Sequence, residues 1–245
     1  MAARASRRRA RRALALRFAG GVTVAMGAVD VAATELEVRL RSVQAPRRVM
    51  TRERARSLTT RQREILDQLE ELFEDGFAGR TMAEIAARVN CSLRTLYELA
   101  PSRDDLVLTV VDRILWRIGR SARDAITPEM APIDAVRAYL LAANAAVGLV
   151  TETFARDLAA VPSAQAVGDA HNGYLVAVTR CLLDLAVERG DVADVDTAAV
   201  AHVVASLGRD LSQPEVSSTL RTSPRVAADA VVDVILNGLS ARRAS

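Results

Sequence analysis

The chain contains 245 residues, half of them apolar, so it is long enough to bury a substantial core in one large or two small domains. Only eight residues are aromatic, glycine and proline are sparse, and no stretch alternates apolar and polar residues, which disfavours β-sheet architectures and predicts an all-α fold. The two cysteines, Cys91 and Cys181, lie far apart, which argues against a disulfide framework and favours the cytoplasm.

The formal net charge of +3 conceals a strongly basic N-terminal region. Residues 1–56 contain 14 arginines and 4 acidic residues, whereas residues 57–245 contain 19 arginines and 26 acidic residues. The apolar stretch 18–33 follows an arginine cluster, as in a signal or transit peptide, but it is shorter than the roughly twenty residues of a membrane span. We therefore predict a basic, disordered extension over residues 1–57, with translation from Met50 as an alternative.

The first predicted helix begins near Thr59, where Thr59 and Gln62 have the spacing of a capping box, and it ends at Gly76. Its apolar residues recur at helical spacing, which predicts a packing role. The preceding run 52–56, RERAR, has two interpretations: an arm that reaches the minor groove of DNA, or a solvated run of charges.

Residues 81–100 have the pattern of two short helices joined by a tight turn. Thr81 and Glu84 form a second capping box, Asn90 suits the left-handed backbone of a turn, and Ser92 can cap the second helix. Helices so close in sequence share a core only by crossing steeply, which leaves the outer face of the second helix free to enter a major groove.

Five longer helices are predicted after this motif. The first is capped by Ser102 with Asp105 and runs toward Thr127. The others are predicted at about 132–157, 163–189, 196–210 and 224–239.

From about Thr59 to Ile118, this order of helices and turns resembles the tetracycline-repressor (TetR) family of transcriptional regulators. The family usually has Gly, Phe and Lys where this chain has Asn90, Ala100 and Arg103. The resemblance implies a helix-turn-helix DNA-binding domain at 58–118, with its motif at 81–100, followed by a helical effector-binding and dimerisation domain at 119–245.

Candidate DNA-contacting residues lie on the second helix of the motif and at two flanking positions. Arg94 is the side chain there able to make a bidentate contact to guanine, with a phosphate contact as the alternative. Thr81 and Tyr97 resemble the family's phosphate clamps, and Arg103 keeps the charge of its phosphate-binding lysine. The predicted set is Thr81, Ser92, Leu93, Arg94, Thr95, Tyr97 and Arg103.

The last two long helices of the family pair with their copies in a homodimer, which would place Val231, Val234 and Ile235 at an interface. The middle helices of the family usually enclose a small-molecule pocket. The few aromatic and polar residues able to line it are Trp116, Tyr139, Asn144, Phe154, His171 and Tyr174.

No nucleophile, phosphate-loop or metalloprotease motif is present, and the two histidines lack metal-ligand spacing, so we expect neither an enzyme, a metal site nor a cofactor. The sequence predicts a cytoplasmic homodimer that binds a near-palindromic operator in double-stranded DNA, with no membrane partner. We expect a repressor released by a small, largely apolar effector. The alternative is a helical small-molecule-binding or interaction protein whose helix-turn-helix is degenerate.

Overall fold

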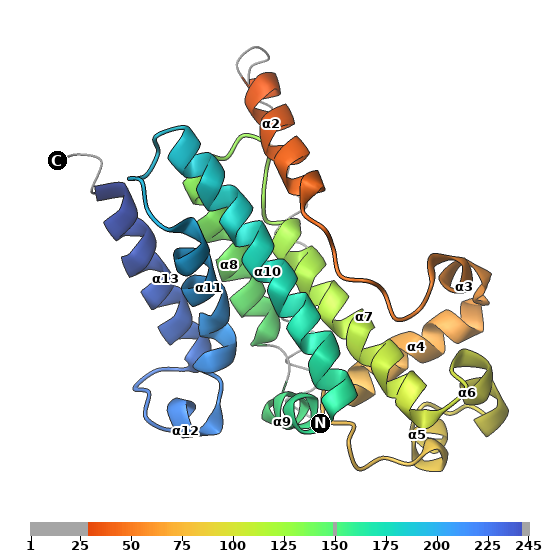
Figure 1. Cartoon of the computed structure of the whole chain (residues 1–245). Coiled ribbons are helices and arrows are strands. Elements are labelled where there is room, and N and C mark those ends of the chain that lie inside the picture. Colours follow the sequence, from red (N-terminus) through yellow and green to blue (C-terminus); the bar gives the residue numbers. More distant parts are fainter. Residues whose placement is uncertain (1–28, 149–150, 242–245) are drawn as a thin grey trace. The chain divides into compact units, whose positions relative to one another are not determined.

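The computed structural model describes residues 29–148 and 151–241, which form helices joined by short loops and contain no strand (Figure 1). The all-α prediction is therefore confirmed. The chain divides into two compact units. We call Gln44–Gly119 with Val150–Val176 the head unit, and we call Met1–Val43 with Arg120–Leu149 and Ala177–Ser245 the body unit.

The head unit contains α3 (Arg52–Ser57), α4 (Thr60–Phe73), α5 (Met82–Arg88), α6 (Leu93–Leu99), α9 (Glu152–Ala160) and parts of α7 (Arg103–Arg123) and α10 (Pro162–Glu188). Both predicted capping boxes are present, at Thr59 with Gln62 and at Thr81 with Glu84. These helices surround one continuous apolar core, because α4, α5, α6 and α7 each direct an apolar stripe inward.

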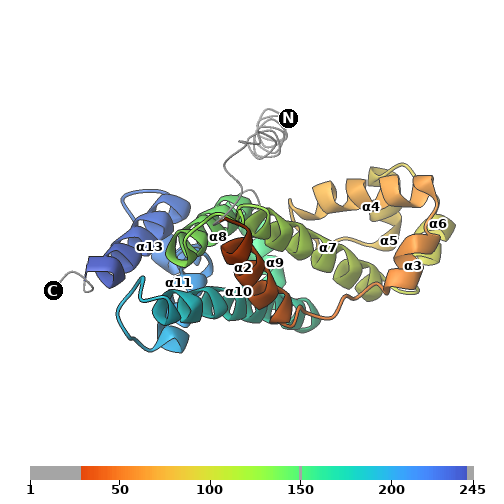
Figure 2. The same ribbon diagram turned by 90° about the horizontal axis from the view of Figure 1, so that it is seen from above.

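The body unit contains α2 (Val29–Ser42), α8 (Pro132–Val147), α11 (Thr197–Asp210), α12 (Pro214–Ser217) and α13 (Pro224–Ala241), with the remaining parts of α7 and α10. Figures 1 and 2 show α8, α11 and α13 packed side by side. Polar contacts fix α8 to α13, since Arg137 pairs with Asp233 and the Asn144 amide donates to Asp229 at 2.9 Å.

The N-terminal segment differs from the disordered extension predicted over residues 1–57. Residues 1–28 lie outside the described part, but residues 29–42 form α2, whose Leu36 and Leu40 are buried. Those leucines are four residues apart and therefore share one helical face. Ion pairs of Arg39 with Glu188 and of Glu35 with Arg189 flank this face. A short segment with a single pair of buried leucines carries little periodic signal, which explains the difference.

The boundary between the units also differs from the predicted boundary at 118/119, because residues 150–176 group with the head. The Asp157 carboxylate accepts the N–H groups of Phe77 at 2.6 Å and Ala78 at 2.9 Å. The ring of Phe154 meets Phe77 edge to face at 5.7 Å between centroids. Thr151 donates its N–H to the Glu74 carbonyl. These contacts are about eighty residues apart in sequence, so local patterns do not reveal them.

Two predicted helices are shorter in the structure. The helix predicted at 132–157 is divided into α8 and α9, and the helix predicted to reach Thr127 ends at Arg123. Among the described residues no single helix is long and apolar enough to span a membrane, although α8 and α9 taken together as a bent pair meet the criteria of length and composition.

Candidate nucleic-acid interface

The helix-turn-helix has the backbone geometry that its sequence predicts. Asn90 lies in the left-handed region at φ +49°, where asparagine is tolerated better than most side chains. The N–H of Cys91 then donates to the carbonyl of Ala86 at 3.0 Å, which closes the end of α5. Leu96 and Leu99 of α6 are buried in the head core, so the opposite face of α6 points to solvent.

That solvent-facing side of α6 carries the predicted recognition residues. The Leu93 and Tyr97 side chains are large apolar groups left 44% and 53% exposed, and the Arg94 side chain is 89% exposed. Arg94 pairs with Glu98 one turn later, with 3.0 Å between Nε and Oε1. Exposed pairs of this kind contribute little to stability, so Arg94 can leave Glu98 at a small cost.

Thr81 and Ser92 serve first as helix caps. The Thr81 hydroxyl accepts the N–H of Glu84 at 3.2 Å, and the Ser92 hydroxyl accepts the N–H of Thr95 at 3.1 Å. Hydrogen bonds from Thr81 to the Glu84 carboxylate hold the pKa of Glu84 below its ordinary value. The caps fix the first turns of α5 and α6, which positions the exposed residues that follow them.

Arg103 occupies a more enclosed position than a simple phosphate contact requires. Its guanidinium donates to the main-chain carbonyls of Phe77, Ala78 and Arg80, the last at 2.6 Å. It also pairs with Asp104 at 3.0 Å. Arg103 therefore holds the loop between α4 and α5 in place, a role that its sequence position does not reveal.

Two further arginines of the head donate to carbonyl groups at helix ends, a role that sequence reasoning missed. Arg54 of α3 donates to the carbonyl of Glu98 in the last turn of α6, and Arg61 of α4 donates to the carbonyl of Asn90 at 3.1 Å. Cations are favoured beside the carbonyl groups of a helix C-terminus. The sequence feature that points to these two contacts is the excess of arginine before and within α4.

A partly buried network of charges joins α4 to α7. Arg113 contacts Asp67 and Glu70 at 2.7 Å each, and Arg117 contacts Glu74 at 2.5 Å. Burial raises the pKa of Glu70, and this effect exceeds the opposing attraction of the two arginines. The network fixes α4 against the part of α7 that belongs to the head unit.

The six candidate effector-lining residues do not converge on one site. Trp116, His171 and Tyr174 come together in the head. The centroid of the Trp116 ring lies 5.4 Å from that of the His171 ring and 6.4 Å from that of the Tyr174 ring. Phe154 is part of the head core instead. Tyr139 and Asn144 lie on α8 in the body unit.

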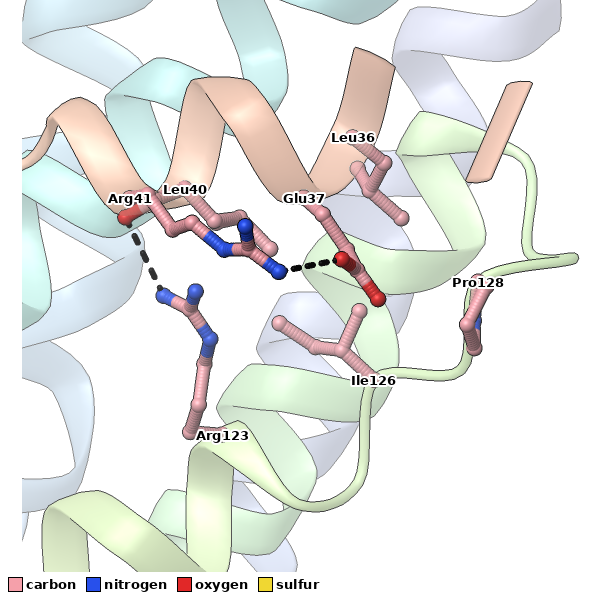
Figure 3. Close-up of a pocket in the computed structure, with 7 residues that line it drawn as sticks. All are labelled: Leu36, Glu37, Leu40, Arg41, Arg123, Ile126 and Pro128. Carbon is pink, nitrogen blue, oxygen red and sulfur yellow. Dashed lines mark hydrogen bonds and ion pairs between the residues drawn. The ribbon is translucent and has the colours of Figure 1, made fainter. Parts of the chain in front are cut away.

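A pocket of about 240 Å³ lies in the body unit, between α2 and the end of α7 with the residues that follow it (Figure 3). Figure 3 shows the Arg123 side chain directed at the carbonyl of Leu40 and Arg41 directed at Glu37. None of its lining residues is a predicted effector residue. The pocket is smaller than the roughly 300–1,000 Å³ of most small-molecule sites, and its charged lining does not match the expected apolar one.

The predicted dimerisation residues lie on α13. Val231 and Val234 are 38% and 72% exposed, and Ile235 is half-buried. Val203 on the neighbouring α11 and Val226 on α13 are exposed as well. Within the described residues, no three His, Cys, Asp or Glu side chains are grouped as a metal site requires.

Comparison with solved structures identifies the fold. The chain is similar to the TetR family transcriptional regulator PfmR from Thermus thermophilus, with 22% identity, a TM-score of 0.52, and coverage of 71% of this chain and 98% of that one. It is also similar to a regulatory protein of the tetR family from Rhodococcus RHA1, with 20% identity, a TM-score of 0.55, and coverage of 74% and 98%.

A third similar structure is the TetR transcription regulator from Haloarcula marismortui ATCC 43049, with 16% identity, a TM-score of 0.61, and coverage of 74% of this chain and 99% of that one. No family model matches the chain, and no curated protein matches it. The resemblance found in the sequence is confirmed at the level of the fold: this chain has the fold of the TetR-family transcriptional regulators.

Proposed function

We propose that the protein is a sequence-specific DNA-binding transcriptional regulator of the TetR family. The observation that carries this proposal is the outer face of α6, where Leu93, Arg94 and Tyr97 are exposed while Leu96 and Leu99 anchor the helix in the core. A short, rigidly held helix with an exposed arginine and exposed apolar side chains is suited to reading base edges in a major groove.

We propose further that it acts as a homodimer through α11 and α13. The exposed valines at positions 203, 226, 231 and 234 give these neighbouring helices an apolar surface that a second copy would cover. Two-fold symmetry would match a near-palindromic operator. A bound dimer of this kind blocks transcription when its site overlaps a promoter, so we propose a repressor.

Effector control is the third part of the proposal. The group formed by Trp116, His171 and Tyr174 offers mixed aromatic and polar chemistry within the head, and the buried Trp116 Nε1 has no hydrogen-bond partner among the described residues. A small, largely apolar molecule with one acceptor atom would satisfy that donor. Ligand binding that prefers one head conformation would then lower DNA affinity.

The DNA-binding proposal is tested by selecting duplexes from a random-sequence pool with the full chain and measuring the affinity at several salt concentrations. Arg94→Ala should cost about 1–3 kcal/mol and relax the preference at one base position in each half-site. Arg180→Ala is the matched control, because Arg180 is an exposed arginine that pairs with Asp184 four residues on, as Arg94 pairs with Glu98. If no duplex is enriched, the protein is instead a helical binding protein with a degenerate helix-turn-helix.

A further inference from the structure

Residues 44–57 of the head unit contact two places to which the proposed function gives different roles. One is the group of Trp116, His171 and Tyr174, and the other is the last turn of the recognition helix α6. The segment is continuous, and its two contact points are only a few residues apart.

The first contact point is made by two adjacent residues. The guanidinium of Arg48 lies over the Trp116 ring, 4.2 Å from its centroid. The N–H of Val49 donates to Asp112 Oδ2 at 3.2 Å, and Oδ1 of the same buried carboxylate lies 3.0 Å from His171 Nε2. The segment thus covers Trp116 and completes the hydrogen bonds of the Asp112 carboxylate.

The second contact point is α3. Thr51 caps this helix by accepting the N–H of Arg54 at 3.2 Å, and the Arg54 guanidinium donates to the carbonyl of Glu98. Leu58, immediately after α3, is buried in the head core. Because α3 is a short helix fixed by its cap, a displacement of Arg48 and Val49 also displaces Arg54.

We propose that residues 44–57 are a coupling strap, which transmits occupancy of the Trp116 group to the end of the recognition helix. Its regulatory consequence rests on the proposed DNA-binding function. A ligand that stacks on the Trp116 ring competes with the Arg48 guanidinium for one face. Release of Arg48 draws Arg54 away from Glu98 and loosens the last turn of α6. By linkage, DNA that orders α6 stabilises the contact between Arg48 and the Trp116 ring and lowers the affinity for such a ligand.

The coupling is tested first without DNA, by amide hydrogen exchange in the full chain. Arg48→Ala removes the contact with Trp116, and the double variant Arg48→Ala, Val49→Pro also removes the main-chain donor to Asp112. The exchange of the Ala100 N–H, which is bonded to the Leu96 carbonyl at 3.0 Å, should become about two- to fivefold faster in Arg48→Ala and faster still in the double variant. Arg47→Ala, on the same segment and equally basic, is the matched control.

Two results would overturn the strap. One is unchanged exchange at Ala100 in the double variant, and the other is an equal acceleration in Arg47→Ala. Either result would mean that the contact at Trp116 and the end of α6 are independent. The Arg47, Arg48 and Val49 side chains are exposed and lie outside the core, and far-ultraviolet circular dichroism of the variants verifies that the helices remain.

A second measurement uses Trp116, the one tryptophan of the chain, as a fluorescent reporter. Binding of a duplex selected from a random pool should change its emission in the wild type. Arg54→Ala should remove most of that change, whereas Arg52→Ala, which deletes an exposed charge from the same helix, should retain it. Equal responses of the two variants would refute coupling through Arg54. Failure to select any duplex would refute the proposed function, while the exchange rates would still decide the strap.

Discussion

Substitution of Asp157 tests whether α9 is an integral part of the head. A single oxygen of Asp157 accepts the N–H groups of Phe77 and Ala78, at 2.6 and 2.9 Å. The preceding Gly76 has φ +106°, and a Cβ built there would lie 2.5 Å from Thr153 Cγ2 of α9. The turn after α4 is therefore shaped by α9, and Asp157→Ala should release it.

The magnitude follows from the two donors. Phe77 is 1% exposed, so its N–H would lose a hydrogen bond to a charged acceptor where water has poor access, a cost of about 1.5–3 kcal/mol. The N–H of Ala78 is exposed and would be solvated, so it adds little. A loss of about 1.5–3 kcal/mol should lower Tm by roughly 3–12 °C in a chain of this size.

Thermal and urea unfolding of the purified variants measure this loss. Asp157→Asn keeps an acceptor oxygen but not the charge, so its loss should be smaller than that of Asp157→Ala. Arg156→Ala, an exposed change on the same helix, is the control. If Asp157→Ala and Arg156→Ala have the same free energy of unfolding within about 0.5 kcal/mol, the two hydrogen bonds do not hold the turn.

Three further predictions concern the charge network, the dimer and the loop before α5. Burial raises the pKa of Glu70, so the stability that protonated Glu70 contributes is present below its unfolded pKa of 4.5 and is lost as pH rises through the folded pKa. Glu70→Gln should therefore flatten the fall of the unfolding free energy with rising pH. A pH profile identical to that of the wild type would contradict this prediction. The double variant Val231→Glu, Val234→Glu should sediment as a monomer. Val38→Glu, an equally drastic change at an exposed valine of α2, should leave the dimer intact. A dimer in the double variant as well as in Val38→Glu would refute the interface. Arg103→Ala should lower Tm because the loop before α5 loses three hydrogen bonds to its carbonyl groups. A flattened salt dependence of DNA binding would show that Arg103 also holds phosphate, and an unchanged one would show that it acts on the loop alone.

The parts of this structure that the sequence predicts are governed by local interactions. The caps at Thr59, Thr81 and Ser92 bond to groups three residues away, so residue type and spacing suffice to find them. The same holds for the left-handed turn at Asn90, where few residue types are tolerated. The helix-turn-helix is thus readable from one sequence.

The parts that escaped prediction depend on contacts between distant segments. The grouping of 150–176 with the head follows from Asp157 and Phe154, whose partners lie near Phe77. A carboxylate at an exposed-looking helical position gives no sign that its donors will be main-chain N–H groups so far away. The effector candidates share only their residue types, which carry no information about distant contacts, and Trp116 and Tyr139 belong to different units.

The arginines of the head show how one residue type can serve both folding and binding. Arg54, Arg61 and Arg103 donate to carbonyl groups at turns and helix ends. A carbonyl is neutral, so these hydrogen bonds do not neutralise the guanidinium groups. The carboxylates of Glu64 and Asp104, which pair with Arg61 and Arg103, offset part of the charge of those two arginines. If the protein binds DNA as we propose, these arginines would also supply positive potential near the duplex, while Arg94, which is exposed and pairs weakly with Glu98, would exchange that partner for a base. On that proposal, affinity and specificity would depend on different arginines within one head.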